Sequence, residues 1–325
     1  MAAQGVVRSS AIKIKQMVCV FSLTLVGLAA MGSVSLAGAS TAAEEAVDLV
    51  IIYPEVREPF ARVFEEIVRG AEEGYQQKVR RVSMADNQSP VDFVHVLDHS
   101  SPVLVLGNRL ARQVAEHNAE RRLIVGAVNS EYSNVFGITL IPDSEVIAQK
   151  LPVLVPAINT VHIVTNAENS LLDFDRATQA LSKQGIQLSI HQAKDIRVAA
   201  GVYRDLMQTL DESDAVWILP KGSFVNNAVL AILLQESWEK HFVVFSSNPI
   251  HVKRGALFSI YPNNYNMGLS LGRLARDVAQ NNSPEREMQA LEDIFVTLNE
   301  RTSNHLGINL TDDVRAHIDL ILPAR

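Results

Sequence analysis

The chain has 325 residues, of which 47% are apolar, 20% charged and only 6% aromatic. This length exceeds that of one typical domain and predicts about two. The net charge of −7 at pH 7 provides no overall positive field for nucleic acid or an anionic membrane surface, so we expect neither as a partner.

The N-terminal segment has the pattern of an export signal. Basic residues precede an apolar run from Met17 to Ala39, and the run ends in small residues. This order is typical of a secretory signal peptide. We expect residues 1–42 to be the signal, with cleavage after Ala39 or Ala42 and a periplasmic mature protein. An uncleaved membrane anchor is the open alternative, because the run is long enough to span a bilayer.

The only cysteine, Cys19, lies within this apolar run. Cleavage would therefore leave a mature chain without cysteine. Such a chain has no disulfide, no thiol nucleophile and no cysteine ligand for a metal.

Beyond the signal, segments with strand and helix periodicity alternate. We predict strands at 47–53, 79–84, 102–106, 123–128, 135–140, 161–165, 186–190, 215–219, 242–245 and 294–298. We predict helices at 56–74, 91–97, 109–117, 143–156, 172–183, 198–210, 225–234 and 312–321, and a further helix opening at Asn263. The alternation restarts near residue 157. We therefore expect an α/β fold with two similar lobes, each built on a parallel sheet covered by helices.

Motifs for catalysis are not found along the chain. No nucleophile-elbow, Walker or dinucleotide-binding motif follows a predicted strand, so hydrolase, ATPase and dehydrogenase interpretations lack their residues. His95 and His99 have the spacing of two metal ligands on a helix, but no third ligand is evident. We predict no catalytic residues, no metal site and no cofactor.

A series of short motifs carries a family resemblance. Within Ser213–Gly268 these are Asp214-Ala215-Val216, the loop after Leu219, Gly255-Ala256-Leu257, Ser259, Pro262, Tyr265 and Gly268. Outside it they are Gly137–Asp143, Asn166–Ser170 and Gly307–Leu310. In this order, from residue 126 onward, the chain resembles the ABC transporter substrate-binding proteins of the type 1 periplasmic-binding fold, a group with tryptophan- and tyrosine-binding members. Residues 47–125 match weakly.

The resemblance implies two Rossmann-like lobes with parallel sheets, joined by a three-segment hinge, with ligand held between them. The crossings would fall near Gly137–Asp143, Ile250–Tyr261 and Thr297–Gly307. The N-terminal lobe would then comprise residues 43–140 and 256–285, and the C-terminal lobe residues 141–255 and 286–325.

Residues in the loops that follow the predicted strands, with Tyr261 near a crossing, are the candidate ligand-binding residues, because open α/β sheets bind ligands at the carboxyl ends of their strands. They are Tyr53, Glu58, Asn108, Asn129, Asn166, Ser170, Ser223, Phe224, Ser247, Asn248 and Tyr261. Each residue taken alone is equally compatible with a helix cap or a turn.

One departure from the resemblance concerns the ligand. Many such proteins carry an acidic residue where this chain has Ser247-Asn248, which questions recognition of an α-amino group. Glu58 is either a substitute for that charge or a carboxylate in the first turn of a helix. The ligand is thus left open between amino-acid-like and other aromatic molecules.

The sequence predicts an exported, monomeric, non-catalytic solute-binding protein that serves the membrane permease of an ABC-type importer. The alternative is a periplasmic ligand-sensing module that signals to a membrane receptor. A periplasmic enzyme would need a nucleophile or metal that the sequence does not display.

Overall fold

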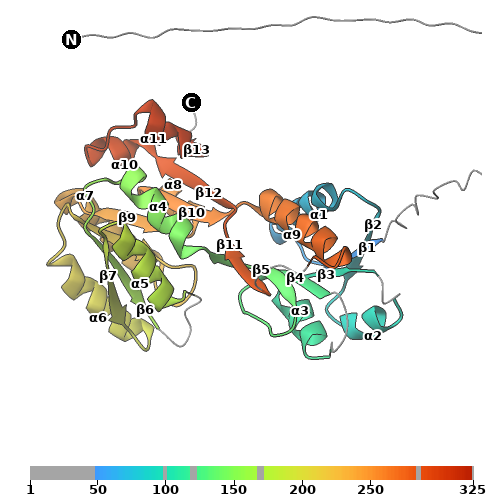
Figure 1. Ribbon diagram of the computed structural model, residues 1–325. Helices are drawn as coiled ribbons and strands as arrows, with labels where there is room; N and C mark the ends of the chain where they lie inside the picture. Colours follow the sequence, from blue (N-terminus) through green and yellow to red (C-terminus); the bar gives the residue numbers. More distant parts are fainter. Residues whose placement is uncertain (1–47, 98–100, 118–122, 167–171, 283–286, 324–325) are drawn as a thin grey trace, which may run out of the picture. The chain divides into compact units, whose positions relative to one another are not determined.

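A computed structural model describes residues 48–97, 101–117, 123–166, 172–282 and 287–323. These residues form two sheets, each with helices on both faces (Figure 1). The predicted signal peptide and Ser170 lie outside the described residues. Of the described helices, none combines the length and the apolar character needed to span a bilayer.

The N-terminal lobe is built on an all-parallel sheet with the strand order β11-β5-β4-β3-β1-β2. Its strands are β1 (Leu49–Pro54), β2 (Val79–Met84), β3 (Val103–Leu106), β4 (Leu123–Val128), β5 (Phe136–Pro142) and β11 (Met288–Leu291). Helices α1 (Phe60–Tyr75) and α9 (Asn264–Ala279) pack on one face, and α2 (Pro90–His95) and α3 (Asn108–Ala115) on the other. Strands β3 and β4 are buried along their whole length, as expected for parallel strands covered on both faces.

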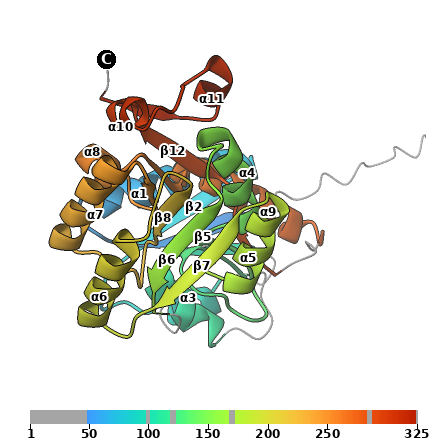
Figure 2. The ribbon, with the colours of Figure 1, turned by 90° about the vertical axis from the view of Figure 1, so that its left-hand side faces the viewer.

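The C-terminal lobe has the strand order β13-β12-β10-β9-β8-β6-β7, parallel except for the β10–β12 pair. Its strands are β6 (Thr160–Thr165), β7 (Gln187–Gln192), β8 (Asp214–Ile218), β9 (Val243–Ser246), β10 (Phe258–Pro262), β12 (Ile294–Asn299) and β13 (Leu320–Leu322). Figure 2 shows α4 (Ser144–Leu154) and α5 (Phe174–Lys183) on one side of this sheet, and α6 (Ile196–Met207) and α7 (Asn227–Lys240) on the other. Three short helices complete the lobe: α8 (Pro249–Arg254), α10 (Glu300–His305) and α11 (Asp312–Ala316).

Polar residues just before the helices fix where they begin. The side chains of Asp173, Asp195, Asn226 and Thr311 each accept a hydrogen bond from a backbone N–H in the first turn of the helix that follows. Capping of this kind satisfies donors that have no partner within the helix. The local sequence therefore determines these starts, including the one at Thr311, directly before the helix predicted to begin at residue 312.

The two-lobed α/β architecture with a three-segment hinge is confirmed, with changes at the crossings. The chain passes between the sheets at Pro142–Ser144, Pro262–Asn264 and Leu291–Ile294. The first crossing falls at the end of the predicted segment, whereas the second lies just beyond Ile250–Tyr261.

The third predicted crossing, at Thr297–Gly307, is wrong. These residues form the end of β12 and α10, both within the C-terminal lobe. The cause is β11, a four-residue strand that the sequence pattern did not reveal and that pairs with β5. Its residues were expected in the C-terminal lobe, and those of β10 in the N-terminal lobe. The pairing of each strand places it in the opposite sheet.

Two further predictions differ from the structure. The loop expected after Ser246 contains helix α8, for which Asn248 is the N-cap. The helix expected over 312–321 ends at Ala316, and the chain then extends into β13. Both errors arise in short elements, for which apolar periodicity carries little information.

The crossings hydrogen-bond to one another. The backbone N–H of Asp143 donates to the carbonyl oxygen of Leu291 at 2.7 Å, and that of Asn263 donates to Asp293 at 2.9 Å. The Ser270 hydroxyl on α9 also donates to the Asp293 carboxylate at 2.7 Å. The three segments therefore form a connected hinge.

Candidate ligand-binding site

A cavity of about 320 Å³ lies at the hinge, between the carboxyl ends of strands from both sheets. The N-terminal lobe contributes the residue after β4, and the C-terminal lobe contributes the loops after β8 and β9. The strands that lead into the first two crossings, β5 and β10, supply apolar side chains, among them Leu140, Ile141 and Ile260. This edge is where parallel α/β sheets bind ligands, and a cavity with walls from two lobes can close around its occupant.

Trp217 on β8 forms a fixed wall of this cavity. Its ring is only 3% exposed and stacks on Phe245 with a centroid distance of 5.6 Å. Phe245 in turn stacks on Phe258 at 4.8 Å. The indole N–H donates to the Ser247 hydroxyl at 3.3 Å, which satisfies the one polar group of the ring. The wall is thus preorganised by ring packing and by a hydrogen bond.

Two polar side chains on the lining make no hydrogen bond or ion pair with any residue that the structure describes. Asn129, in the N-terminal lobe, donates its backbone N–H to the side-chain oxygen of Asn108, but its own side-chain amide has no hydrogen-bond partner among the described residues. Lys221, in the C-terminal lobe, forms no salt bridge with any described carboxylate. Both groups are available to a ligand.

The first crossing is held by an ion pair. The buried carboxylate of Asp143 accepts the N–H of Glu145 at 2.8 Å and also pairs with the guanidinium of Arg176 on α5. Because the cavity residues Ile141 and Pro142 immediately precede Asp143, this pair fixes the hinge side of the site.

Of the residues selected from sequence, Asn129 and Ser247 line the cavity. Asn108 is not on the lining but contacts a lining residue, since its side-chain oxygen accepts the backbone N–H of Asn129 at 2.7 Å. These three residues all follow central strands, where the rule that ligands bind at strand carboxyl ends applies most directly.

Four other selected residues have structural contacts elsewhere. Ser223 is buried and donates its hydroxyl to the carbonyl oxygen of Leu219 at 3.2 Å. Phe224, with a positive φ of 54°, packs on the core beneath α6 and α7. Asn248 caps α8, and Glu58 lines a separate surface pocket beside α1.

The remaining candidates are also placed by the structure. The hydroxyl of Tyr261 lies 3.0 Å from that of Thr297, and the Tyr261 ring lies against Phe295. Tyr53 packs on the core of the N-terminal lobe, and the backbone of Asn166 donates to Gly222 at 3.1 Å. None of the three is among the described residues that line the cavity.

Sequence reasoning missed Trp217 and Lys221. Trp217 lies inside the predicted strand 215–219 and was not selected, because the candidates were sought after the strands. Lys221 belongs to the loop after Leu219, but the residues selected from that loop were Ser223 and Phe224. The signal was available, because Leu219-Pro220-Lys221 directly follows a central strand.

Comparison with protein families identifies the chain. Residues 122–319, more than half of the sequence, match the model of the family described as ABC transporter substrate binding protein. The chain belongs to this family. It is accordingly a solute-binding protein, and its fold follows the type 1 periplasmic-binding pattern. No curated protein matches it in a sequence search.

Solved structures show the same fold at low sequence identity. A ligand-free, open structure of a substrate-binding protein with adhesive properties from Clostridium difficile is 15% identical, with a TM-score of 0.61 over 84% of this chain and 99% of that one. An ABC domain from Streptococcus pneumoniae in complex with L-Trp is 14% identical, with a TM-score of 0.53 over 85% and 100%. A conserved domain protein from Vibrio cholerae is 13% identical, with a TM-score of 0.52 over 85% and 100%.

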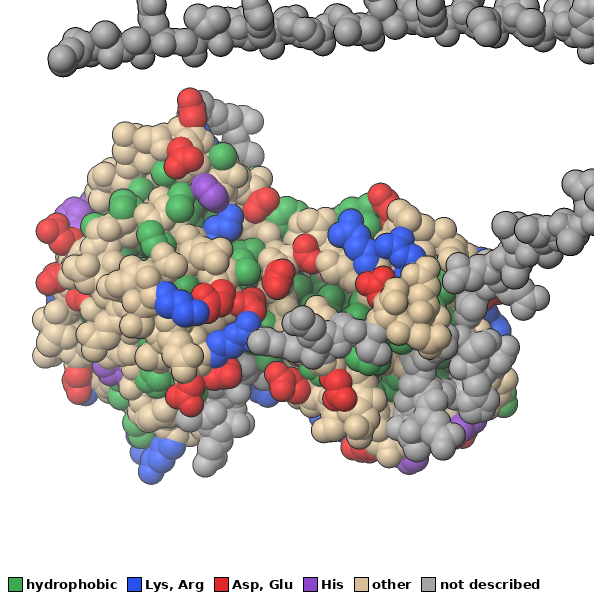
Figure 3. All heavy atoms as spheres, in the orientation of Figure 1, with side chains coloured by type: hydrophobic (Ala, Val, Ile, Leu, Met, Phe, Trp, Pro, Cys, Tyr) green, Lys and Arg blue, Asp and Glu red, His purple; other side chains and the backbone are tan. Residues whose placement is uncertain are grey.

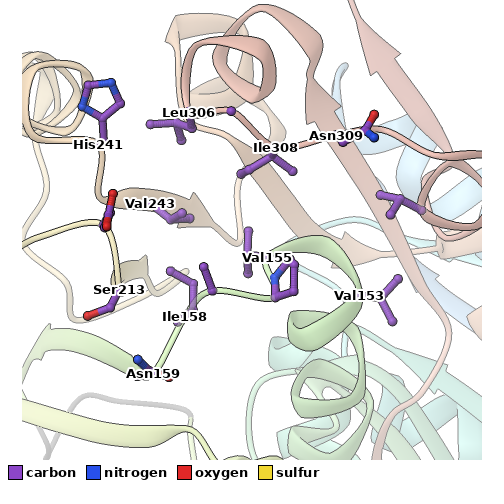
Figure 4. Close-up of a pocket in the computed structure, with 15 residues that line it drawn as sticks. Val153, Val155, Ile158, Asn159, Ser213, His241, Val243, Leu306, Ile308 and Asn309 are labelled. Atoms are coloured by element: carbon purple, nitrogen blue, oxygen red, sulfur yellow. The ribbon is translucent and has the colours of Figure 1, made fainter.

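This substrate-binding protein has a second, larger cavity of about 740 Å³ within the C-terminal lobe (Figure 4). It lies at the amino ends of β6, β8 and β9, and Val155, Ile158 and Ile308 converge on it. Because it belongs to one lobe and lies at the opposite ends of the strands, hinge motion cannot close it. The hinge cavity is therefore the better candidate for the solute.

On the face seen in Figure 3, acidic and basic side chains of the described residues lie interspersed. Charges of alternating sign create no extended single-sign field.

Proposed function

We propose that this protein is exported to the periplasm, captures a small organic molecule in the hinge cavity and presents it to the permease of an ABC-type importer. The observation that carries the proposal is the cavity itself, which takes its walls from both lobes and from the crossings. The N-terminal sequence pattern supports export, and the family match supports a transport partner. In this role the protein releases its ligand unchanged and is not an enzyme.

A thermal-shift screen tests capture. The exported protein is screened against amino acids, aromatic and aliphatic carboxylic acids, sugars and nucleosides. A true ligand stabilises the folded form by about 2.7 kcal/mol at a hundredfold excess over its dissociation constant. Mass spectrometry of the same material reports the mature N-terminus, and intact residues 1–42 would contradict signal cleavage.

The two tryptophans of the chain supply a matched pair of variants. Trp217→Leu removes a cavity wall and should abolish the shift caused by the ligand. Trp238→Leu alters a residue on α7 that is 39% exposed and should preserve it. For each variant, the quantity compared is the rise in unfolding temperature when ligand is added. A change in the stability of the ligand-free variant therefore does not affect the comparison. Absence of any hit, or the reverse pattern in the two variants, would overturn the proposal.

The role of the captured solute is tested separately. Uptake of the identified ligand should be lost when the gene is deleted and restored by the wild-type chain. Unchanged uptake together with a lost transcriptional response would favour the sensing module, and turnover of the ligand by the pure protein would show an enzyme.

A further inference from the structure

The charges around the hinge cavity indicate which solute it takes, an inference that rests on the proposed function. Lys221 is the only charged residue among those described on the lining, and no described carboxylate lines it. Asn129 adds an amide that has no hydrogen-bond partner among the described residues, and the Ser247 hydroxyl already accepts the indole N–H of Trp217. The polar groups on the described lining of the cavity therefore include several hydrogen-bond donors and one positive charge.

A carboxylate is the ligand group that matches these donors and this charge. Its oxygens are acceptors, whereas the ammonium group of Lys221 and the amide N–H of Asn129 on the lining are donors, and hydrogen bonds between charged groups are the stronger class. An ammonium group does not fit, because Lys221 repels it. The described lining also offers it no anionic partner to offset its desolvation.

The rest of the cavity selects an apolar body. Leu140, Leu172 and Leu219 line it together with the buried ring of Trp217. Its volume of about 320 Å³ lies at the lower end of the usual range for ligand pockets, which suits one ring with a short chain. Because Trp217 is held by the stacked Phe245, a flat ring can pack on a surface that does not need to rearrange.

We infer that the hinge cavity binds a small monocarboxylic acid with an apolar, ring-sized body, and that it discriminates against the same body carrying an α-ammonium group. The distinguishing feature is that Lys221 and Asn129 line one cavity that has no acidic residue on its described lining.

Three probes with one body test this inference: 3-phenylpropionate, L-phenylalanine and 3-phenylpropanamide. They differ only in carrying a carboxylate alone, a carboxylate with an ammonium group, or a neutral amide. Calorimetric titration of the full exported protein should show 3-phenylpropionate binding about tenfold or more tighter than each of the other two, as loss of one charged hydrogen bond predicts.

Matched lysine variants locate the effect. Lys221→Met should weaken 3-phenylpropionate about tenfold and leave 3-phenylpropanamide unchanged. Lys253→Met makes the same charge change on α8, at an exposed position outside the lining, and should alter neither. Asn129→Asp adds a carboxylate at nearly constant shape and should shift the preference toward L-phenylalanine.

The outcomes separate this inference from the broader proposal. Preference for L-phenylalanine in the wild-type protein, or equal losses from both lysine variants, would overturn the inference while leaving solute capture intact. Failure of all three probes, together with a hit among sugars or nucleosides in the thermal screen, would also overturn only the inference. Failure of every compound in that screen would overturn solute capture as well.

Discussion

The two lobes share a fold but are held together by different means. In the N-terminal lobe, helices from opposite ends of the sequence pack with their backbones nearly in contact. In the C-terminal lobe, a row of aromatic rings runs across neighbouring strands. The packing of the N-terminal lobe thus depends on glycines, which have no side chain, at the contact between two helices. The packing of the C-terminal lobe depends on stacked aromatic side chains.

Glycines allow the close approach of α1 and α9 (Figure 1). A Cβ added to Gly70 would lie 2.0 Å from the carbonyl oxygen of Tyr265, and one added to Gly268 would lie 2.1 Å from that of Ile67. Gly74 and Gly272 are equally restricted, at 2.2 Å from a backbone oxygen. Each helix presents a pair of glycines four residues apart, which places both on the same face. The lobe is thus completed only after the chain has returned through the second crossing.

The aromatic row follows from strand register. Trp217, Phe245 and Phe258 are direct neighbours on β8, β9 and β10, so their rings stack on one face of the sheet. Cross-strand pairs of this kind stabilise a sheet and fix side-chain positions. The C-terminal lobe therefore provides the ligand with a rigid surface.

The largest effect is expected for Gly268→Ala. Its new methyl group would collide with the backbone of α1, so we expect the free energy of unfolding to fall by about 3 kcal/mol or more. Denaturant unfolding measures this loss.

Gly201→Ala is the control for Gly268→Ala. Gly201 lies within α6, where an added Cβ would meet only a side-chain nitrogen of Arg204 at 3.8 Å. We expect a gain of about 0.5–1 kcal/mol there, because alanine favours a helix over glycine. Similar losses in the two variants would remove the distinction between the lobes.

Phe245→Leu tests the contribution of the aromatic row in the C-terminal lobe. It removes the middle ring of the row, and we expect a loss of about 1–2 kcal/mol in the free energy of unfolding. Although Phe245 does not line the cavity, the variant should also weaken ligand binding, because Trp217 loses its support. Phe295→Leu changes a ring outside the row and should leave binding intact. Unaltered affinity in the Phe245 variant would show that the row is dispensable.

The smallest effect concerns the dependence of stability on pH. It involves three polar side chains in contact on the sheet of the C-terminal lobe, Asp214, His162 and His191, which we call the polar chain. His162 Nε2 lies 3.1 Å from Asp214 Oδ1, and its Nδ1 lies 3.1 Å from His191 Nε2. Burial, and to a lesser degree the charge of His162, lower the pKa of His191 below its usual 6.5. The unfolded chain therefore takes up this proton at a higher pH than the folded chain. Stability is complete above about pH 6.5 and falls as the pH is lowered through that value toward the folded-state pKa.

Replacing His191 by glutamine should flatten this fall by at most about 1.4 kcal/mol per pH unit. The free energy of unfolding, measured between pH 7 and 5, tests the prediction. His117→Gln changes an exposed ring in the N-terminal lobe and should leave the slope unaltered. A slope that responds equally to both substitutions would contradict a special role for the polar chain.

Most long helices and strands are predicted correctly from the sequence. The elements that were missed are short, and the strands among them form only by pairing with other segments. Strands 79–84 and 123–128 agree with the structure to the residue, because polar residues bound each segment on both sides. Strand β11 has four residues and is defined only by pairing with β5, a partner about 150 residues earlier in the chain. Without this strand, the third crossing was misplaced.

The site was partly predictable for the same reason. Asn129 and Ser247 follow central strands, were selected by position alone, and lie on the cavity lining; their contact with ligand stays a prediction. Ser223 and Phe224 also follow a strand, but their side chains turn to the core, a direction that local sequence does not specify. Trp217 lies within a strand and is buried, yet it also lines the cavity, so a search confined to the residues after strands does not find it.

The sequence by itself determined the alternating strands and helices, the helix caps, the two-lobed architecture and the family, because these depend on local periodicity and on motifs in order. Tertiary structure alone decided which strand joins which sheet, where the chain crosses, and that Lys221 and Asn129 share one cavity. Those features arise from pairing between distant segments, and the free energy of such pairing belongs to neither segment alone.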